Sequence, residues 1–141
     1  MTSKERFIEI FKTNIKREGA EELLNFLLSD HSDFFTAPAS TRFHGAYEGG
    51  LLEHSLNVYD CLCDILARPR MQDVYGIHYS AESAAIVALL HDLCKVNFYK
   101  VSFRNAKDES GKCFRVTTKV RHFLTEVTSA GTANIRDTLP L

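Results

Sequence analysis

The stretch AAIVALLHDLCK, residues 84–95, decides the fold, because an almost wholly apolar helix runs in it directly into His91 and Asp92. A helix that is apolar on all sides is expected to be central and buried in a helical domain. An imidazole and a carboxylate at its end are costly to bury without a partner. A divalent cation suits both groups as ligands. On this pair alone, a metal site and a core histidine beside a helix-end aspartate remain equal alternatives.

A second histidine, on the preceding long helix, favours the metal site. His54 lies in GGLLEHSLNV, residues 49–58, and the periodicity predicts a helix from about 51 to 67. Two neighbouring helices that each present a ligand inward are how helical bundles build metal sites. Side chains at adjacent helical positions point about 100° apart. His91 and Asp92 can therefore bind the same ion only at a helix end or where the local helix geometry is adjusted. Otherwise they bind two different ions. We expect His54 to point inward because its face also carries Val58, Cys61 and Ile65.

The rest of the chain is predicted to be mostly helical, with one small β-hairpin after the His-Asp helix. Gly49 and Gly50 let the backbone turn tightly before a helix, and Ser80 is a suitable N-cap. From Phe98 the apolar residues alternate, which is typical of a strand. The predicted elements are helices at 3–16, 20–29, 51–67 and from 81, a loop at 30–40, a connection at 70–79, and a hairpin with its polar tip at 105–111.

Bulk properties exclude several classes of protein. The 141 residues fit one domain, and the net charge of −1 gives no overall attraction to nucleic acid or membrane. No apolar run approaches the ~20 residues that span a bilayer. The charged N-terminus lacks the apolar core of a signal peptide, so a cytoplasmic protein without membrane partners is expected. Free thiols are expected for the four cysteines, Cys61, Cys63, Cys94 and Cys113.

In this order and spacing, the two motifs resemble the HD superfamily of metal-dependent phosphohydrolases. The longer stretch FHGAYEGGLLEHSLNV, residues 43–58, is similar to a bacterial and phage branch that includes HD-domain 3′–5′ exoribonucleases. The resemblance covers about residues 41–104. It implies a compact, mostly α-helical bundle and identifies His54, His91 and Asp92 as metal ligands. Mn²⁺ or Mg²⁺ is favoured by the hard ligands, while two histidines keep Fe, Ni, Co or Zn open.

Further residues are carried over from the same resemblance. Lys95 matches a lysine suited to a substrate phosphate and joins His91 and Asp92 as a catalytic residue; a solvated helix-end cation is nearly as good an interpretation. His44 is a candidate contact to substrate or metal, against a surface-loop histidine. Arg104 is a candidate phosphate contact, against a solvated loop residue.

Beyond the region of resemblance, the periodic pattern of the chain fades after Thr117. The family's later helical histidine and aspartate are missing, and only His122 and Asp137 have the right type late in the chain. A truncation or frameshift near Thr117 is one hypothesis. A single HD-type domain is expected over 1–141, with N-terminal helices at 1–40, the motif core at 41–104, and a hairpin with an atypical, truncated tail at 105–141.

The function predicted from these motifs is hydrolysis of a phosphate ester, either a small molecule or a nucleic acid. Nucleotides, cyclic nucleotides and RNA are the candidate substrates. The first alternative is a catalytically incomplete fragment that binds nucleotide or phosphate, or that has no activity. The second is a purely structural helical domain. The sequence makes no prediction of the oligomeric state.

Overall fold

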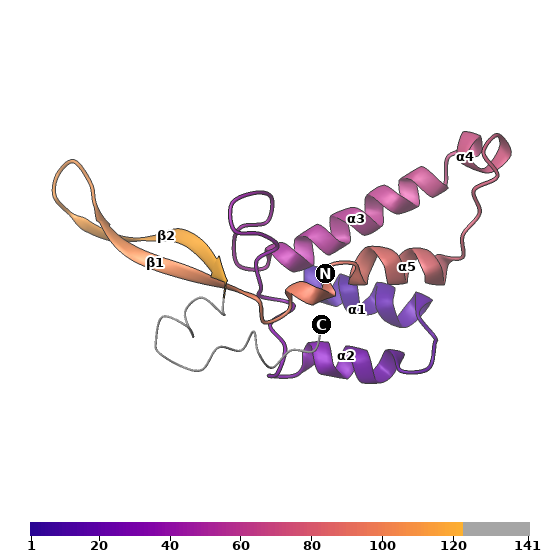
Figure 1. Ribbon diagram of the computed structural model, residues 1–141, viewed down its shortest axis with the longest axis horizontal. Helices are drawn as coiled ribbons and strands as arrows, with labels where there is room; N and C mark the ends of the chain where they lie inside the picture. The colour runs from indigo at the N-terminus through magenta and orange to yellow at the C-terminus, as the bar shows by residue number, and fades with distance from the viewer. Residues whose placement is uncertain (123–141) are drawn as a thin grey trace, which may run out of the picture.

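The computed structural model describes residues 1–122, with the backbone alone at 100, 102–106 and 114–122. Within this range the chain is mostly helical, as predicted. Helices α1, α3 and α5 pack against one another, and α2 lies below them in Figure 1. The elements are α1 (Ser3–Asn14), α2 (Ala20–Leu28), α3 (Gly50–Leu66), α4 (Pro69–Asp73), α5 (Ala81–Leu90), the 3₁₀ turn η1 (Leu93–Lys95), β1 (Tyr99–Lys107) and β2 (Cys113–His122).

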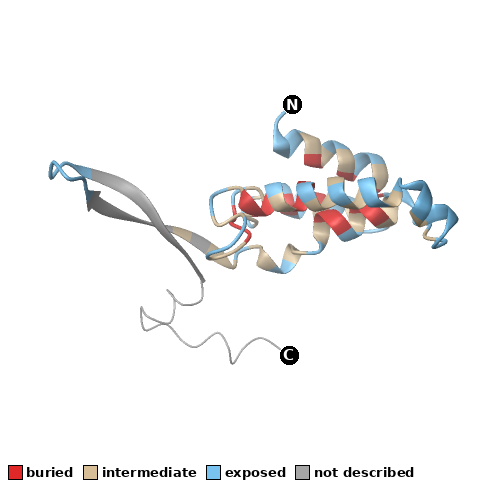
Figure 2. Cartoon of the chain, turned by 90° about the horizontal axis from the view of Figure 1, so that it is seen from above, coloured by how far each residue is buried: buried red, intermediate tan, exposed pale blue. Residues whose placement is uncertain are grey.

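The core forms where the apolar faces of these helices meet (Figure 2). Phe7 and Phe11 lie one turn apart on α1 and are almost fully buried. Phe34, from the loop after α2, packs on Phe7 with ring centroids 5.0 Å apart. Leu51 of α3 and Leu89 of α5 are both fully buried. The core therefore joins the first turns of α3 to the last turns of α5, which is where the site residues lie.

Helix α5 is less enclosed than its composition predicts. Ala85, Ala88 and Leu89 have no exposed surface, but Val87 is 61% exposed. The expectation of burial on all sides is thus wrong for one face. The reason is that α5 packs on α3 and α1, which cover part of its circumference. Its N-terminus is as predicted, since the Ser80 hydroxyl accepts a hydrogen bond from the Ser83 N–H at 3.0 Å.

The remaining elements of the described chain are the short helix α4, between α3 and α5, and the strand pair that follows η1. The predicted connection at 70–79 holds most of α4, a short helix that begins just before it at Pro69. After η1, strands β1 and β2 pair in antiparallel register from Tyr99↔His122 to Lys107↔Cys113, with an irregularity between Ser102 and Phe103. The pair extends away from the helices in Figure 1. None of the helices among residues 1–122 has the length and apolar character required to cross a bilayer.

Candidate metal centre

Helices α3 and α5 bring the three predicted ligands together. The Nε2 atoms of His54 and His91 lie 3.1 Å apart. The Oδ2 atom of Asp92 lies 3.3 Å from the first and 3.4 Å from the second. Among the described residues these three form the group able to hold a metal ion. The side chains are 21%, 31% and 17% exposed for His54, His91 and Asp92, so the centre is reachable from solvent.

The end of α5 explains how two adjacent residues reach one point. His91 is the C-cap of the helix, and Asp92 has left it, with φ −103° and ψ 20°. The turn into η1 redirects the carboxylate, which would otherwise diverge from the imidazole. His54 reaches the same point from the second turn of α3. The predicted inward face is only half correct, because Cys61 and Ile65 are exposed.

A main-chain carbonyl of α5 determines which ring nitrogen of His91 carries the hydrogen. The Nδ1 atom of His91 lies 2.8 Å from the carbonyl oxygen of Ala88. A carbonyl can only accept, so Nδ1 carries the hydrogen and donates it. In the neutral ring the lone pair is then on Nε2, which faces His54 and Asp92. Metal-binding histidines use this kind of partner to fix ring orientation and basicity.

The spacing of the three atoms fits a divalent cation. Bonds of about 2.1 Å place neighbouring ligands about 3.0 Å apart on an octahedral ion and about 3.4 Å apart on a tetrahedral one. The observed separations of 3.1, 3.3 and 3.4 Å fall within this range. Without a proton or cation between them, two nitrogen lone pairs and a carboxylate at this spacing repel one another. The donor set therefore suits a cation in both geometry and charge.

Burial and charge keep the ligands in the forms that bind metals. Burial lowers the pKa of His54, with His44, His91 and Lys95 adding to the effect against the attraction of Asp92. Burial opposes ionisation of Asp92, but the hydrogen bond and charge of Lys95 and the nearby histidines hold its pKa below the usual value. A metal ligand must be a neutral imidazole or an ionised carboxylate. Both shifts favour that form at neutral pH.

Lys95 belongs to the centre through the same carboxylate. Its Nζ donates to Oδ2 of Asp92 at 2.8 Å, three residues along the turn. The side chain is 22% exposed, which contradicts a fully solvated helix-end cation. Because the ammonium group lies beside the candidate ligand oxygen, it carries positive charge next to any ion held there.

His44 joins the site from the loop that precedes α3. Its ring stacks on that of His54, with centroids 4.6 Å apart and planes at 37°. The sequence resemblance made His44 a candidate contact, but its position against His54 depends on the path of the loop, which a sequence pattern does not predict. His31 and His78 are exposed, as expected of residues without a motif. The predicted contact of Arg104 falls where the backbone alone is described, and Asp137 lies outside the described residues.

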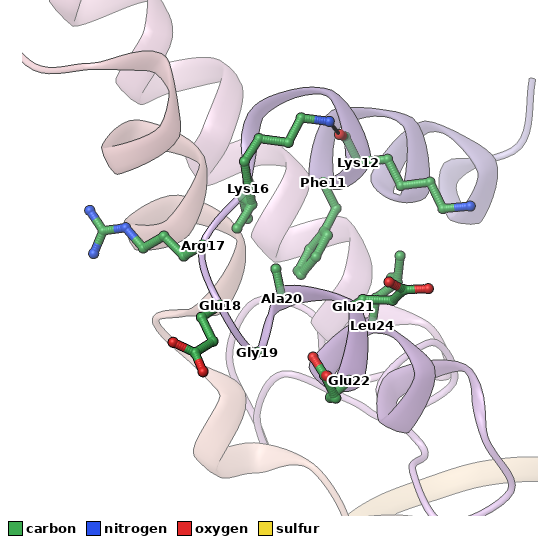
Figure 3. A pocket seen from close by; sticks show the side chains of 11 residues that line it. Phe11, Lys12, Lys16, Arg17, Glu18, Gly19, Ala20, Glu21, Glu22 and Leu24 are labelled. Carbon is green, nitrogen blue, oxygen red and sulfur yellow. Dashed lines mark hydrogen bonds between the residues drawn. The ribbon is translucent and has the colours of Figure 1, made fainter.

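A separate cavity of about 570 Å³ lies at the turn between α1 and α2 (Figure 3). The buried residues Phe11 and Leu24 line it together with charged residues. Lys16 reaches back to donate to the main-chain carbonyl of Lys12, as the dashed line shows. The lining residues run from Phe11 to Leu24, so this cavity shares none with the metal centre.

Comparison with known proteins gives one informative match. No family model matches the chain, and no solved structure matches it. A 62-residue segment is 39% identical to the dihydroneopterin 2′,3′-cyclic phosphate phosphodiesterase of Methanocaldococcus jannaschii. The match covers 42% of this chain, and it spans 23% of the length of that relative. The comparison therefore relates part of this chain to a phosphodiesterase.

Proposed function

We propose that this chain is a metal-dependent phosphohydrolase domain of the HD superfamily. One observation carries the proposal: His54, His91 and Asp92 present their ligand atoms within 3.1–3.4 Å of one another. The two motifs that resemble the superfamily supply these three residues. The partial relative acts, by its name, on a cyclic phosphate ester, which supports the same class of substrate here.

Each residue of the centre has a proposed role. His54, His91 and Asp92 would hold the divalent ion, with Mn²⁺ or Mg²⁺ favoured by the carboxylate and Fe, Ni, Co or Zn compatible with the imidazoles. When bound, such an ion supplies an activated water and offsets charge on the phosphoryl oxygens. Lys95 binds a phosphoryl oxygen from the side of Asp92. His44, stacked on His54, is a further substrate contact.

The proposed substrate is a phosphate ester with nucleotide, cyclic nucleotide and RNA as its candidates. The proposed domain covers 1–141, and residues 41–104 hold its motifs. Arg104 is proposed as a further phosphate contact, on the strength of the sequence resemblance alone. An ion held by His54, His91 and Asp92 would remain accessible to water and to a substrate phosphate.

Hydrolysis of a generic phosphodiester with Mn²⁺ tests the proposal. The wild-type chain and His91→Ala are compared, with His78→Ala as a control for loss of an exposed imidazole. Activity that requires Mn²⁺ and is lost only in His91→Ala supports the proposed enzyme. No activity in the wild type, with nucleotide binding retained, refutes the enzyme and indicates a binding module. No metal found by elemental analysis and no effect of chelation on thermal stability indicate a structural domain.

A further inference from the structure

The loop that carries His44 has a fixed backbone. The Ser40 hydroxyl accepts a hydrogen bond from the Phe43 N–H at 3.0 Å and donates one to the His44 carbonyl at 2.9 Å. The Ala39 N–H donates to the Gly45 carbonyl at 2.8 Å. One side chain and one main-chain bond therefore close the loop around its tip.

Two glycines hold this loop against the start of α3. A Cβ on Gly50 would lie 2.0 Å from the carbonyl oxygen of Gly45, so the two backbones touch. Gly45 itself has φ +67°, and a Cβ there would lie 2.7 Å from that of Ala39. Because α3 carries His54, the loop tip is fixed relative to the metal centre. The stacking of His44 on His54 is the visible result.

The residue before His44 has an aromatic side chain that is exposed to solvent. Phe43 is 78% exposed, although its N–H and the next carbonyl are both hydrogen-bonded to Ser40. Its Cα is about 3.8 Å from that of His44, by the length of one peptide unit. The structure thus presents an exposed aromatic ring on a rigid loop, one residue from a ring that stacks on a candidate ligand.

A second aromatic residue of the loop is fixed in the same neighbourhood. The pKa of Tyr47 is raised, first by the hydrogen bond that its hydroxyl makes to Glu53 and then by burial and the charge of Glu53. Glu53 precedes His54 on α3. Tyr47 is 46% exposed, so part of its ring also faces solvent. Two exposed aromatic residues, Phe43 and Tyr47, therefore lie on the loop that leads into the helix of His54.

We propose that Phe43 is a stacking platform for a planar heterocycle on the substrate, and that the substrate is a nucleoside phosphate. This inference rests on the proposed function, which places the phosphate at His54, His91 and Asp92. Every nucleobase has a π face that an aromatic side chain can stack on without reading the sequence. A base on Phe43 and a phosphate at the ligands would place the two ends of one nucleotide on adjoining surfaces.

The test compares two ligands that differ by the nucleoside. A non-hydrolysable phosphonate analogue of AMP and methylphosphonate are titrated into the full chain with Mn²⁺, by isothermal calorimetry. We expect Phe43→Ala to weaken binding of the nucleotide analogue by roughly 5- to 100-fold, the range for loss of a base platform. Methylphosphonate binding should be unchanged, and Phe43→Tyr should retain the wild-type affinity for both.

Tyr75→Ala is the matched control, since Tyr75 is a 58% exposed aromatic residue in the segment after α4. It should change neither affinity. Equal binding of both ligands by the wild type, or unchanged nucleotide binding in Phe43→Ala, would overturn the inference. Hydrolysis of a nucleoside 2′,3′-cyclic phosphate, which carries the base, reports separately on the proposed function. Its absence, with Phe43-dependent nucleotide binding intact, refutes the enzyme and supports the platform.

Discussion

Removing the His91 imidazole should abolish stabilisation by metal while leaving the metal-free fold nearly intact. His91 supplies one of three converging ligand atoms, 3.1 Å from His54 Nε2 and 3.4 Å from Asp92 Oδ2. Mn²⁺ at 100 times its dissociation constant stabilises a folded protein by about 2.7 kcal/mol. In a chain of this size each kcal/mol raises the melting temperature by roughly 3–5 °C. The wild type should therefore gain about 8–13 °C.

The variant His91→Ala should gain far less at the same Mn²⁺ concentration. Loss of an outer-shell partner alone costs 10- to 100-fold in metal affinity, and loss of a ligand should cost at least about 100-fold. The metal would then stand near its dissociation constant and stabilise by only about 0.4 kcal/mol, or 1–2 °C. Without metal, the variant loses the Ala88 hydrogen bond from a 31% exposed side chain, which costs about 1 kcal/mol.

Thermal unfolding followed by circular dichroism, with Mn²⁺ or with EDTA, measures these shifts. His78→Ala is the matched control, because it removes an exposed imidazole distant in sequence from the three ligands. It should keep the full wild-type response. A wild-type chain that does not respond to Mn²⁺, or a His91→Ala variant that responds as strongly, would refute the assignment of these atoms as ligands.

Three further outcomes follow from the described structure. Gly50→Ala should destabilise the fold by more than about 2 kcal/mol in urea unfolding, because its Cβ would meet the Gly45 carbonyl oxygen; wild-type stability would contradict that contact. Ser55→Ala should raise the free energy of unfolding by about 1 kcal/mol, since the buried Ser55 hydroxyl has no hydrogen-bond partner among the described residues; a clear loss would mean that it has one. The free energy of unfolding of the metal-free chain should fall as the pH drops below about 6.5. The reason is that His54 binds a proton in the unfolded chain at this pH, whereas in the folded chain its pKa is lowered and it binds the proton only at lower pH. A flat profile of this free energy against pH, measured by urea titration, would contradict the prediction.

The sequence predicted the helices and the candidate ligands for clear physical reasons. Helical spacing of apolar residues placed α3 within one residue of its observed bounds and α5 at its observed start, whereas α5 ends at Leu90, before the predicted end. The cost of burying His91 and Asp92 at the end of an apolar helix pointed to a cation. His54 followed from its place on the preceding helix and from the resemblance to the HD superfamily. Periodicity and composition therefore indicated the helices, and the resemblance indicated the ligand set.

Other features of the fold and the site depend on tertiary contacts, which the pattern of residues along the chain does not predict. The exposure of Val87 depends on how much of α5 its neighbours cover, which periodicity does not report. The stacking of His44 on His54 depends on a loop whose path is set by Gly45 and Gly50. The bond from Lys95 to Asp92 depends on the turn into η1. Each arises from the packing of segments distant in sequence or from an irregular turn.

The end of α5 at His91 has a consequence for the order of binding at the proposed site. The last carbonyl groups of a helix lack partners within it, and the aligned peptide dipoles place about half a negative charge at this end. Ala88 offers one of these carbonyls to His91, and Asp92 adds a negative charge next to it that Lys95 only partly offsets. A phosphate that arrived alone would meet this negative end, whereas a divalent cation is attracted to it. The proposed enzyme should therefore bind its cation first and its anionic substrate second.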